Sequence, residues 1–125
     1  MIRIFFWWIA ISAFFLTKPV FGANIAPIII LDPPLESSCL CGQIKVYTER
    51  KWLEGALIEE VMPDFTQVIQ TTHSVKNGYF KFPETSSEEF HYICVSGGAG
   101  FRTMCYKIKI SKKSTKPIII EIPYR

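Results

Sequence analysis

Short apolar runs that alternate with polar residues constrain the fold of this chain more than any other feature. Seven of them fall between residues 42 and 122, separated by Gly, Asn and Pro residues. Period-two alternation is typical of half-buried strands, and short strands between such turns are typical of β-sandwiches. We therefore predict an all-β fold with strands at Gly42–Thr48, Ala56–Met62, Val68–Thr72, Tyr79–Phe82, Phe90–Cys94, Tyr106–Ile110 and Ile118–Ile122.

The same alternation predicts which side chains fill the interior. Ile44 and Val46 share the inner face of the first strand, which leaves Lys45 and Tyr47 on the outer face. Further along, the sequence of Lys76–Gly78 predicts a tight turn, because Asn and Gly both tolerate a positive φ.

Aromatic residues of two later strands are predicted to lie in the core. Phe80 and Phe82 have the same parity and are expected to point inward together. On the following strand, we expect Phe90 and Tyr92 to be buried in preference to His91, because they are large and apolar. We therefore expect His91, which points to the opposite face, to be exposed to solvent.

The first 22 residues have the pattern of a secretory signal peptide. Arg3 supplies a positive start, the apolar run Ile4–Leu16 follows, and Val20–Gly22 offers compact residues before a cleavage site after Gly22. A membrane anchor is the alternative, but this run is 13 residues long, whereas a bilayer-spanning helix needs roughly 20. We expect cleavage, and no transmembrane segment after it.

Removal of this signal changes the charge of the chain. The full chain carries a formal charge of +3. Arg3 and Lys18 leave with the signal, so 12 of the 14 basic residues remain against 11 acidic ones, a charge of +1. The charge therefore gives no support for a nucleic-acid partner. The lysines near the C-terminus are expected to form the solvated face of a strand and its flanking turn.

Residues 23–38 are predicted to be an extended lead-in to a single domain at residues 39–125. Pro27, Pro33 and Pro34 forbid a helix there and restrict any pairing to the edge of a sheet. Ile28–Leu31 is too apolar to remain in water. We expect it to lie against the sandwich or to meet a partner.

Four cysteines, Cys39, Cys41, Cys94 and Cys105, are the disulfide candidates. A small exported domain has a thin margin of stability, and disulfides are common in such domains. A bond between Cys39 and Cys41 closes a very small ring, so we expect these two residues to bridge to Cys94 and Cys105. The sequence leaves open which pairs with which.

A metal site or a redox centre is the alternative use of these cysteines. Cys-x-Cys is not a strong zinc signature, and His73 and His91 have no paired spacing. The Cys-x-x-Cys arrangement of redox enzymes is missing. We predict no metal site and no cofactor. The acidic pairs Glu59–Glu60 and Glu88–Glu89 are expected in solvated turns and edges.

Four motifs occur in the order that they have in the carboxypeptidase regulatory-like family. Gly42–Ile44 resembles the Gly-x-Val that opens the family's first strand, and Trp52–Ala56 resembles its Pro-Leu-x-Gly-Ala motif. Asn77–Phe80 is similar to its Asp-Gly-x-Phe turn, and Phe90–Cys94 with Gly100-Phe101 is similar to its last motif. The resemblance covers most of residues 42–122. It departs from the family at Trp52, where the family has Pro, at Asn77, where the family has Asp, and in the added cysteines.

This resemblance implies a seven-stranded antiparallel Greek-key β-sandwich of the transthyretin-like type. It also implies a non-catalytic folding, spacing or recognition module, because the matched residues are structural in the family. A related transthyretin-like hydrolase of 5-hydroxyisourate closes with Tyr-Arg-Gly-Ser. This chain has Tyr124-Arg125 without the last two residues, and it has no histidine on its first strand.

These observations lead to the expectation of a secreted or periplasmic binding or structural module that is not an enzyme. Trp52, Tyr47 and Tyr79 flank predicted turns, and they are the candidate surface for stacking on an envelope carbohydrate. A protein partner is the alternative, and it would be engaged through Ile28–Leu31 as a donated strand.

Overall fold

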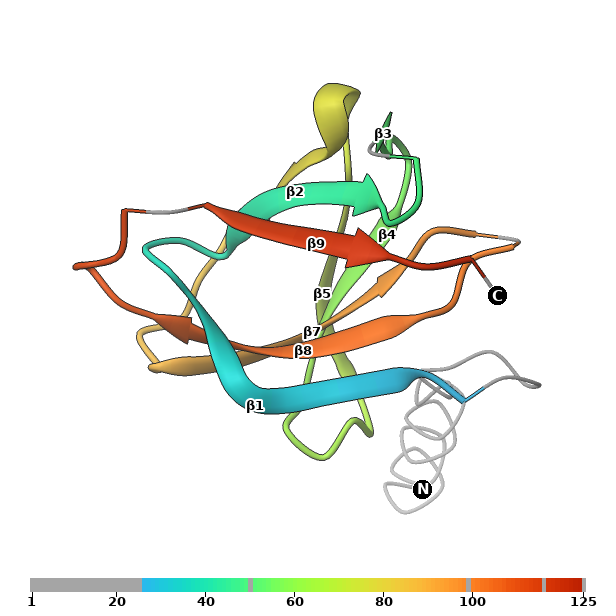
Figure 1. The fold of residues 1–125 in the computed structure, drawn as a ribbon. Helices are drawn as coiled ribbons and strands as arrows, with labels where there is room; N and C mark the ends of the chain where they lie inside the picture. Colours follow the sequence, from blue (N-terminus) through green and yellow to red (C-terminus); the bar gives the residue numbers. More distant parts are fainter. Residues whose placement is uncertain (1–25, 50, 99, 116, 125) are drawn as a thin grey trace, which may run out of the picture.

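Two mixed β-sheets pack face to face in the computed structural model, which describes residues 26–49, 51–98, 100–115 and 117–124 (Figure 1). The predicted signal peptide and the first residues of the lead-in lie outside the described residues. No α-helix occurs in the described part of the chain, as the alternation predicts. The sequence is therefore that of an all-β protein.

Five strands form the larger sheet. Its order is β1-β8-β7-β4-β5, with bounds Ile28–Ser37, Met104–Ile110, Phe90–Ser96, Leu57–Val61 and Val68–His73. The smaller sheet has β2 at its centre, paired with β3, β6 and β9; these four span Cys41–Val46, Lys51–Trp52, Tyr79–Lys81 and Ile118–Ile122. All seven predicted strands are present within a few residues of their expected positions.

The predicted strand number and the antiparallel pairing are both wrong. The described residues contain nine strands, because the lead-in forms β1 and the short segment Lys51–Trp52 forms β3. Two of the pairings are parallel, β1 with β8 and β2 with β9. Alternation in a sequence reports which face a side chain takes, but it carries no information about which strand lies alongside.

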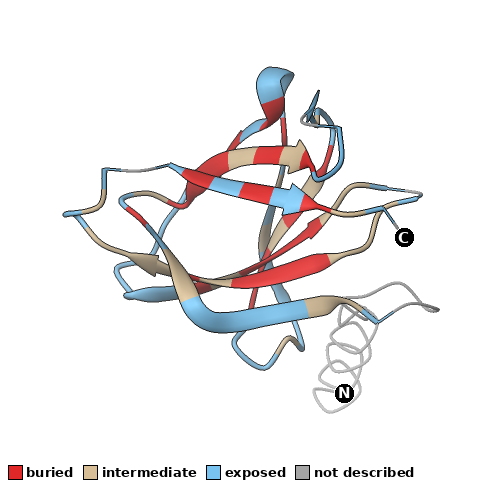
Figure 2. Ribbon diagram, viewed as in Figure 1, coloured by how far each residue is buried: buried red, intermediate tan, exposed pale blue. Residues whose placement is uncertain are grey.

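The core lies between the two sheets and takes residues from both of them. Figure 2 marks the buried residues in red along the strands. The predicted inward positions of Ile44 and Val46 are confirmed, and so are those of Phe80 and Phe82. The two phenylalanine rings meet edge to face at 6.3 Å between centroids, a favourable aromatic arrangement. Other core residues come from both sheets: Leu40, Ala56, Ile58, Ile93, Val95, Met104, Tyr106, Ile108, Ile118, Ile120 and Ile122.

The proline-containing lead-in lies at the edge of the larger sheet, as predicted. Its ladder with β8 is interrupted between Ile30 and Leu35, the segment that holds Pro33 and Pro34. Proline lacks the amide hydrogen that an inner strand needs, so an edge position accommodates it. Ile28 packs against the core, whereas the chain from Ile29 to Leu31 remains exposed.

The predicted turn at Lys76–Gly78 is confirmed as a single 3-10 turn before β6. Asn77 has φ of 68° and Gly78 has φ of 74°, the left-handed conformation that these residue types tolerate. A Cβ atom at Gly78 would also clash with the backbone carbonyl of Ile44 on β2. Glycine is therefore required there for two separate reasons.

The cysteines pair differently from the prediction. Cys39 bonds to Cys41, and Cys94 bonds to Cys105. Cys94 and Cys105 are direct neighbours on β7 and β8, and they lie on the outer face of the larger sheet. Cys39 and Cys41 flank Leu40, at the start of the smaller sheet. The core therefore separates the two pairs, and the predicted bridges between them cannot form.

Candidate functional site

The three aromatic residues singled out in the sequence belong to one sheet. Trp52 on β3 is the direct neighbour of Lys45, and Tyr79 on β6 is the direct neighbour of Gln43. Since the alternate residues of β2 point into the core, these side chains lie on its outer face. Tyr47 follows just beyond β2, and by the same alternation its side chain is on the side of Gln43 and Lys45. The structure thus places all three predicted residues on a common outer surface, here called the aromatic face.

Strand β9 extends this aromatic face on the other side of β2. Ile119 is the neighbour of Gln43, and Glu121 is the neighbour of Lys45. Two rows of side chains therefore cross the sheet. One row is Tyr79, Gln43 and Ile119, and the other is Trp52, Lys45 and Glu121.

The aromatic side chains of this face are open to solvent. Trp52 is 38% exposed, Tyr79 is 43% exposed and Tyr47 is 62% exposed. The Nζ atom of Lys45 lies 5.7 Å from the centre of the Trp52 ring, within the range of a cation–π contact. Gln43 donates a hydrogen bond from Nε2 to the carbonyl of Asn77 at 3.0 Å. Charged and amide groups are thus fixed between the rings.

A hollow of about 450 Å³ adjoins the aromatic face at Tyr47. Ile119 and Glu121 line it from the face, while Ile30 and Tyr106 line it from the larger sheet. Burial, with a smaller contribution from the Glu121 carboxylate, raises the pKa of Tyr106 to about 12. Its hydroxyl therefore keeps its proton at neutral pH and is available as a hydrogen-bond donor.

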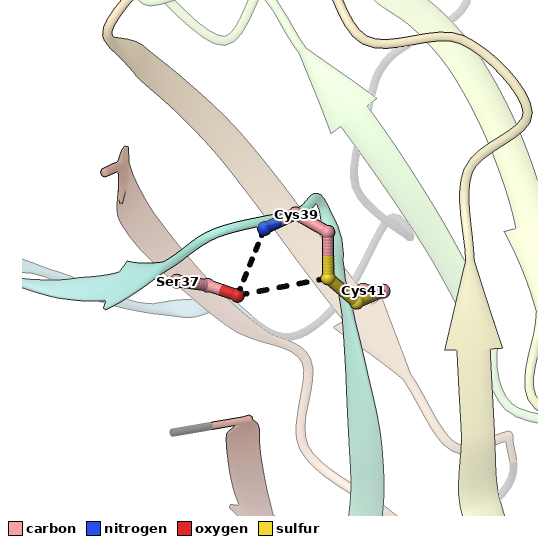
Figure 3. Close-up of a disulfide and its surroundings, with 3 residues drawn as sticks. All are labelled: Ser37, Cys39 and Cys41. Atoms are coloured by element: carbon pink, nitrogen blue, oxygen red, sulfur yellow. Dashed lines mark hydrogen bonds between the residues drawn. A yellow bond between two sulfur atoms is a disulfide. The ribbon is translucent and has the colours of Figure 1, made fainter. Parts of the chain in front are cut away.

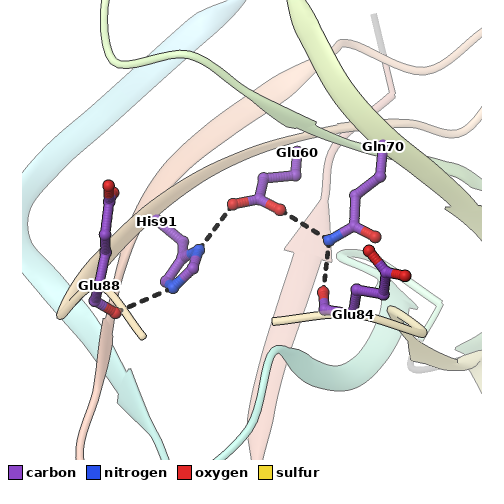
Figure 4. A network of polar contacts seen from close by, with 5 residues as sticks. All are labelled: Glu60, Gln70, Glu84, Glu88 and His91. Carbon is purple, nitrogen blue, oxygen red and sulfur yellow. Dashed lines mark hydrogen bonds and ion pairs between the residues drawn. The ribbon is translucent and has the colours of Figure 1, made fainter. Parts of the chain in front are cut away.

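A second polar arrangement lies between the larger sheet and the loop that joins β6 to β7, and the sequence prediction missed it (Figure 4). His91 is 2% exposed and Glu60 is 6% exposed. The expected exposure of His91 and the expected solvated position of Glu60 are therefore both wrong. His91 shares its parity on β7 with the core residues Ile93 and Val95, and Glu60 shares its parity on β4 with the core residue Ile58.

Four hydrogen-bond contacts join the polar groups of this network. Nδ1 of His91 lies 2.6 Å from Oε2 of Glu60, and Nε2 of His91 lies 3.0 Å from the carbonyl of Glu88. Gln70 on β5 donates from Nε2 to Oε1 of Glu60 at 2.8 Å and to the carbonyl of Glu84 at 2.6 Å. Because a carbonyl only accepts, Nε2 of His91 carries a hydrogen, and one further proton lies between Nδ1 and Glu60.

This network holds the loop that joins β6 to β7. Both loop carbonyls, those of Glu84 and Glu88, accept hydrogen bonds from side chains on the larger sheet. An open pocket of about 820 Å³ lies beside the loop, with Glu60 and Gln70 in its lining; its other residues are Met62, Pro63, Ile69, Glu84, Thr85, Ser86 and Glu88.

The geometry gives this second arrangement a structural role. Both ring nitrogens of His91 are occupied within the protein, so neither is directed at the pocket as a base. In the part of the chain that the structure describes, no three His, Cys, Asp or Glu side chains gather closely enough to hold a metal ion. The sequence gives a single indication of this network: Glu60 and His91 each alternate in step with inward-facing residues of their own strand. It does not show that they pair, because their partners come from other strands.

Comparisons with known proteins give no relative for this chain: no family model, curated protein or solved structure matches it. Among the described residues, no helix is long and apolar enough to cross a membrane.

Proposed function

We propose that this protein is an exported, non-catalytic binding module whose aromatic face binds carbohydrate of the cell envelope. One observation carries the proposal: Trp52, Tyr79 and Tyr47 lie exposed on the outside of one sheet, with Lys45 and Gln43 between them. Pyranose rings present apolar C–H faces that stack on aromatic side chains, while their hydroxyls bond to amide and charged groups. The hollow beside Tyr47 offers space for a substituent of the sugar.

Export is supported by the signal-like pattern of residues 1–22 and by the two cysteine pairs at bonding distance. Such pairs fit an oxidising, extracellular type of compartment. The motifs at residues 42–101 support a relation to carboxypeptidase regulatory-like domains and their transthyretin-like, Greek-key sandwiches. In that family the domain is a non-catalytic module, which agrees with a binding role.

The test measures binding to envelope glycans by the native protein, Trp52→Ala and Phe90→Ala. Phe90 is the matched control: it is exposed on the outer face of the other sheet, and Lys107 lies 4.3 Å from its ring centre. We expect Trp52→Ala to weaken binding at least tenfold, because stacking is lost, and Phe90→Ala to leave it unchanged. If the native protein binds none of the glycans, or if both variants bind equally, the proposal is wrong.

A protein partner that adds a strand to β1 is the second candidate. Among the described strands β1 pairs only with β8, and Ile29 and Leu31 are exposed along it. An added strand would take its hydrogen bonds from the free edge and cover these side chains. Because β1 is part of the sheet, substitution is a better test than deletion. Ile29→Lys should abolish capture of such a partner, while glycan binding persists.

A further inference from the structure

The two disulfides differ in how far a reagent in solution can reach them. Cys94 and Cys105 are 1% and 0% exposed, and Val61 and Tyr92 pack around them. Cys41 is 8% exposed, whereas Cys39 is partly exposed. Figure 3 shows the bond between them just before β2, with Ser37 beside it. An external thiol can therefore approach Cys39 in the folded protein, but it cannot approach the other pair.

The sequence separation of the two pairs also differs. Cys39 and Cys41 are two residues apart, whereas Cys94 and Cys105 are eleven residues apart. A crosslink that closes so small a loop removes little entropy from the unfolded chain, so it adds less to stability than the longer one. The bond between Cys39 and Cys41 is thus both the more accessible and the less important for stability.

Polar neighbours lie on both sides of this short disulfide. Oγ of Ser37, itself buried, accepts a hydrogen bond from the Cys39 amide at 3.2 Å and lies 3.8 Å from Cys39 Sγ. Lys81 on β6 is directly opposite Cys41 in the antiparallel ladder. Directly opposed residues have Cβ atoms about 5 Å apart on the same face. The basic side chain of Lys81 therefore starts on the same face of the sheet as Cys41.

We propose that Cys39 and Cys41 form a redox-active disulfide that exchanges electrons with an external dithiol. A thiolate of the dithiol attacks Sγ of Cys39, a mixed disulfide forms, and Sγ of Cys41 leaves as a thiolate. The second thiolate of the dithiol then attacks the mixed disulfide, which releases Cys39 and closes the dithiol into a disulfide. Two electrons pass to the protein, and the two cysteine sulfurs take up the two protons that the dithiol loses.

The surroundings favour this direction of attack. Cys39 is the more exposed sulfur, so the incoming thiolate reaches it first. The departing charge on Cys41 is stabilised by Lys81, and a better-stabilised leaving thiolate is released faster. The hydroxyl of Ser37 donates to Sγ of Cys39 in the disulfide, where the sulfur has no hydrogen, and it can also donate to the thiolate that forms on reduction.

The site is tested by reducing the folded protein at neutral pH with dithiothreitol, a small dithiol, and in parallel with reduced thioredoxin, a protein dithiol. Free thiols are trapped by alkylation and located by peptide mass spectrometry. We expect Cys39 and Cys41 to be labelled at least tenfold faster than Cys94 and Cys105. Faster reduction by thioredoxin than by dithiothreitol indicates a protein dithiol as the partner, and the reverse indicates a small dithiol. Labelling of all four cysteines at one rate, or none before unfolding, overturns the proposal.

The role of the lysine is tested with Lys81→Gln, and Lys51→Gln is the matched control. Both lysines are exposed on the smaller sheet, but Lys51 is opposite Val46 and not opposite a cysteine. We expect Lys81→Gln to slow reduction on the order of threefold and Lys51→Gln to leave the rate unchanged. Equal rates in the native protein and in Lys81→Gln overturn the assignment of Cys41 as the leaving group.

Discussion

Oε2 of Glu60 lies 2.6 Å from Nδ1 of His91, and both side chains are buried between the larger sheet and the loop that precedes β7. Glu60 also accepts a hydrogen bond from Gln70, and His91 also bonds to a loop carbonyl. Removal of either partner therefore leaves a buried polar atom without its hydrogen bond, which is costly. This pair ties β4 and β7 to the loop before β7.

Substitution of Glu60 should separate the effect of its charge from the effect of its hydrogen bonds. Glu60→Leu removes both acceptors and should lower the free energy of unfolding by about 3–5 kcal/mol. Glu60→Gln can donate to Nδ1 of neutral His91 and still accept from Gln70, so it should cost less than about 1 kcal/mol. Urea unfolding measures both. Equal losses in the two variants would contradict the proton assignment.

Two glycines with similar backbone angles should respond differently to a methyl group. Gly55 has φ of 84° and nothing within 4 Å of an added Cβ, whereas a Cβ at Gly78 meets the Ile44 carbonyl. Gly55→Ala should cost only the strain of a left-handed alanine, about 1–2 kcal/mol. Gly78→Ala should cost at least about 2 kcal/mol more, because β2 and the turn must separate. Thermal unfolding of both variants checks this difference. A similar loss in each would show that the contact can relax.

The stability of the protein should fall as the pH rises from 10 to 12, in part through Tyr106. Its pKa in the folded state is raised to about 12, against about 10 in an unfolded chain. In this range the unfolded state has lost the proton that the folded state keeps, so alkali favours unfolding. The contribution of the Tyr106 hydroxyl to the free energy of unfolding is fully present below pH 10.

Tyr106→Phe is the control for this alkaline effect. It has no proton to lose, so from pH 9 to pH 11 it should lose less free energy of unfolding than the native protein, by about 1 kcal/mol. Urea unfolding at the two pH values measures the difference. An identical loss in the native protein and the variant would mean that Tyr106 ionises as easily in the folded state as in the unfolded one.

The strand positions could be predicted because alternation is a local property of the sequence. Ile44, Val46, Phe80 and Phe82 all point inward as expected, since each lies in a run where apolar and polar residues take turns. The pairing of β1 with β8 was beyond such reasoning, because its partners are distant in the sequence. Nothing in the run Ile28–Leu31 identifies β8 as its neighbour.

The errors at His91 and at the cysteines have a common physical origin. Phe90 and Tyr92 were expected to be buried because they are apolar, but they lie on the outer face, where Lys107 is close to both rings. His91 could take the inner position because Glu60, on another strand, satisfies it. The face of the sheet toward which His91 points thus depends on a partner that the local sequence does not reveal. The cysteine pairing failed likewise, because it depends on which sheet each cysteine joins.

Both parallel pairings connect an early strand to a late one. Ile28 on β1 pairs with Met104 on β8, and Gly42 on β2 pairs with Ile118 on β9, each 76 positions further along the chain. Ribosomes deliver β1 and β2 first, so each of these strands must wait until its partner, 76 positions further along, has been made before its sheet can close. Contacts between residues so far apart in the sequence slow folding. They also prolong the time during which the unpaired edges of β1 and β2 are exposed to other molecules. A nascent copy of this protein should therefore depend on a holding chaperone until its last strand has been made.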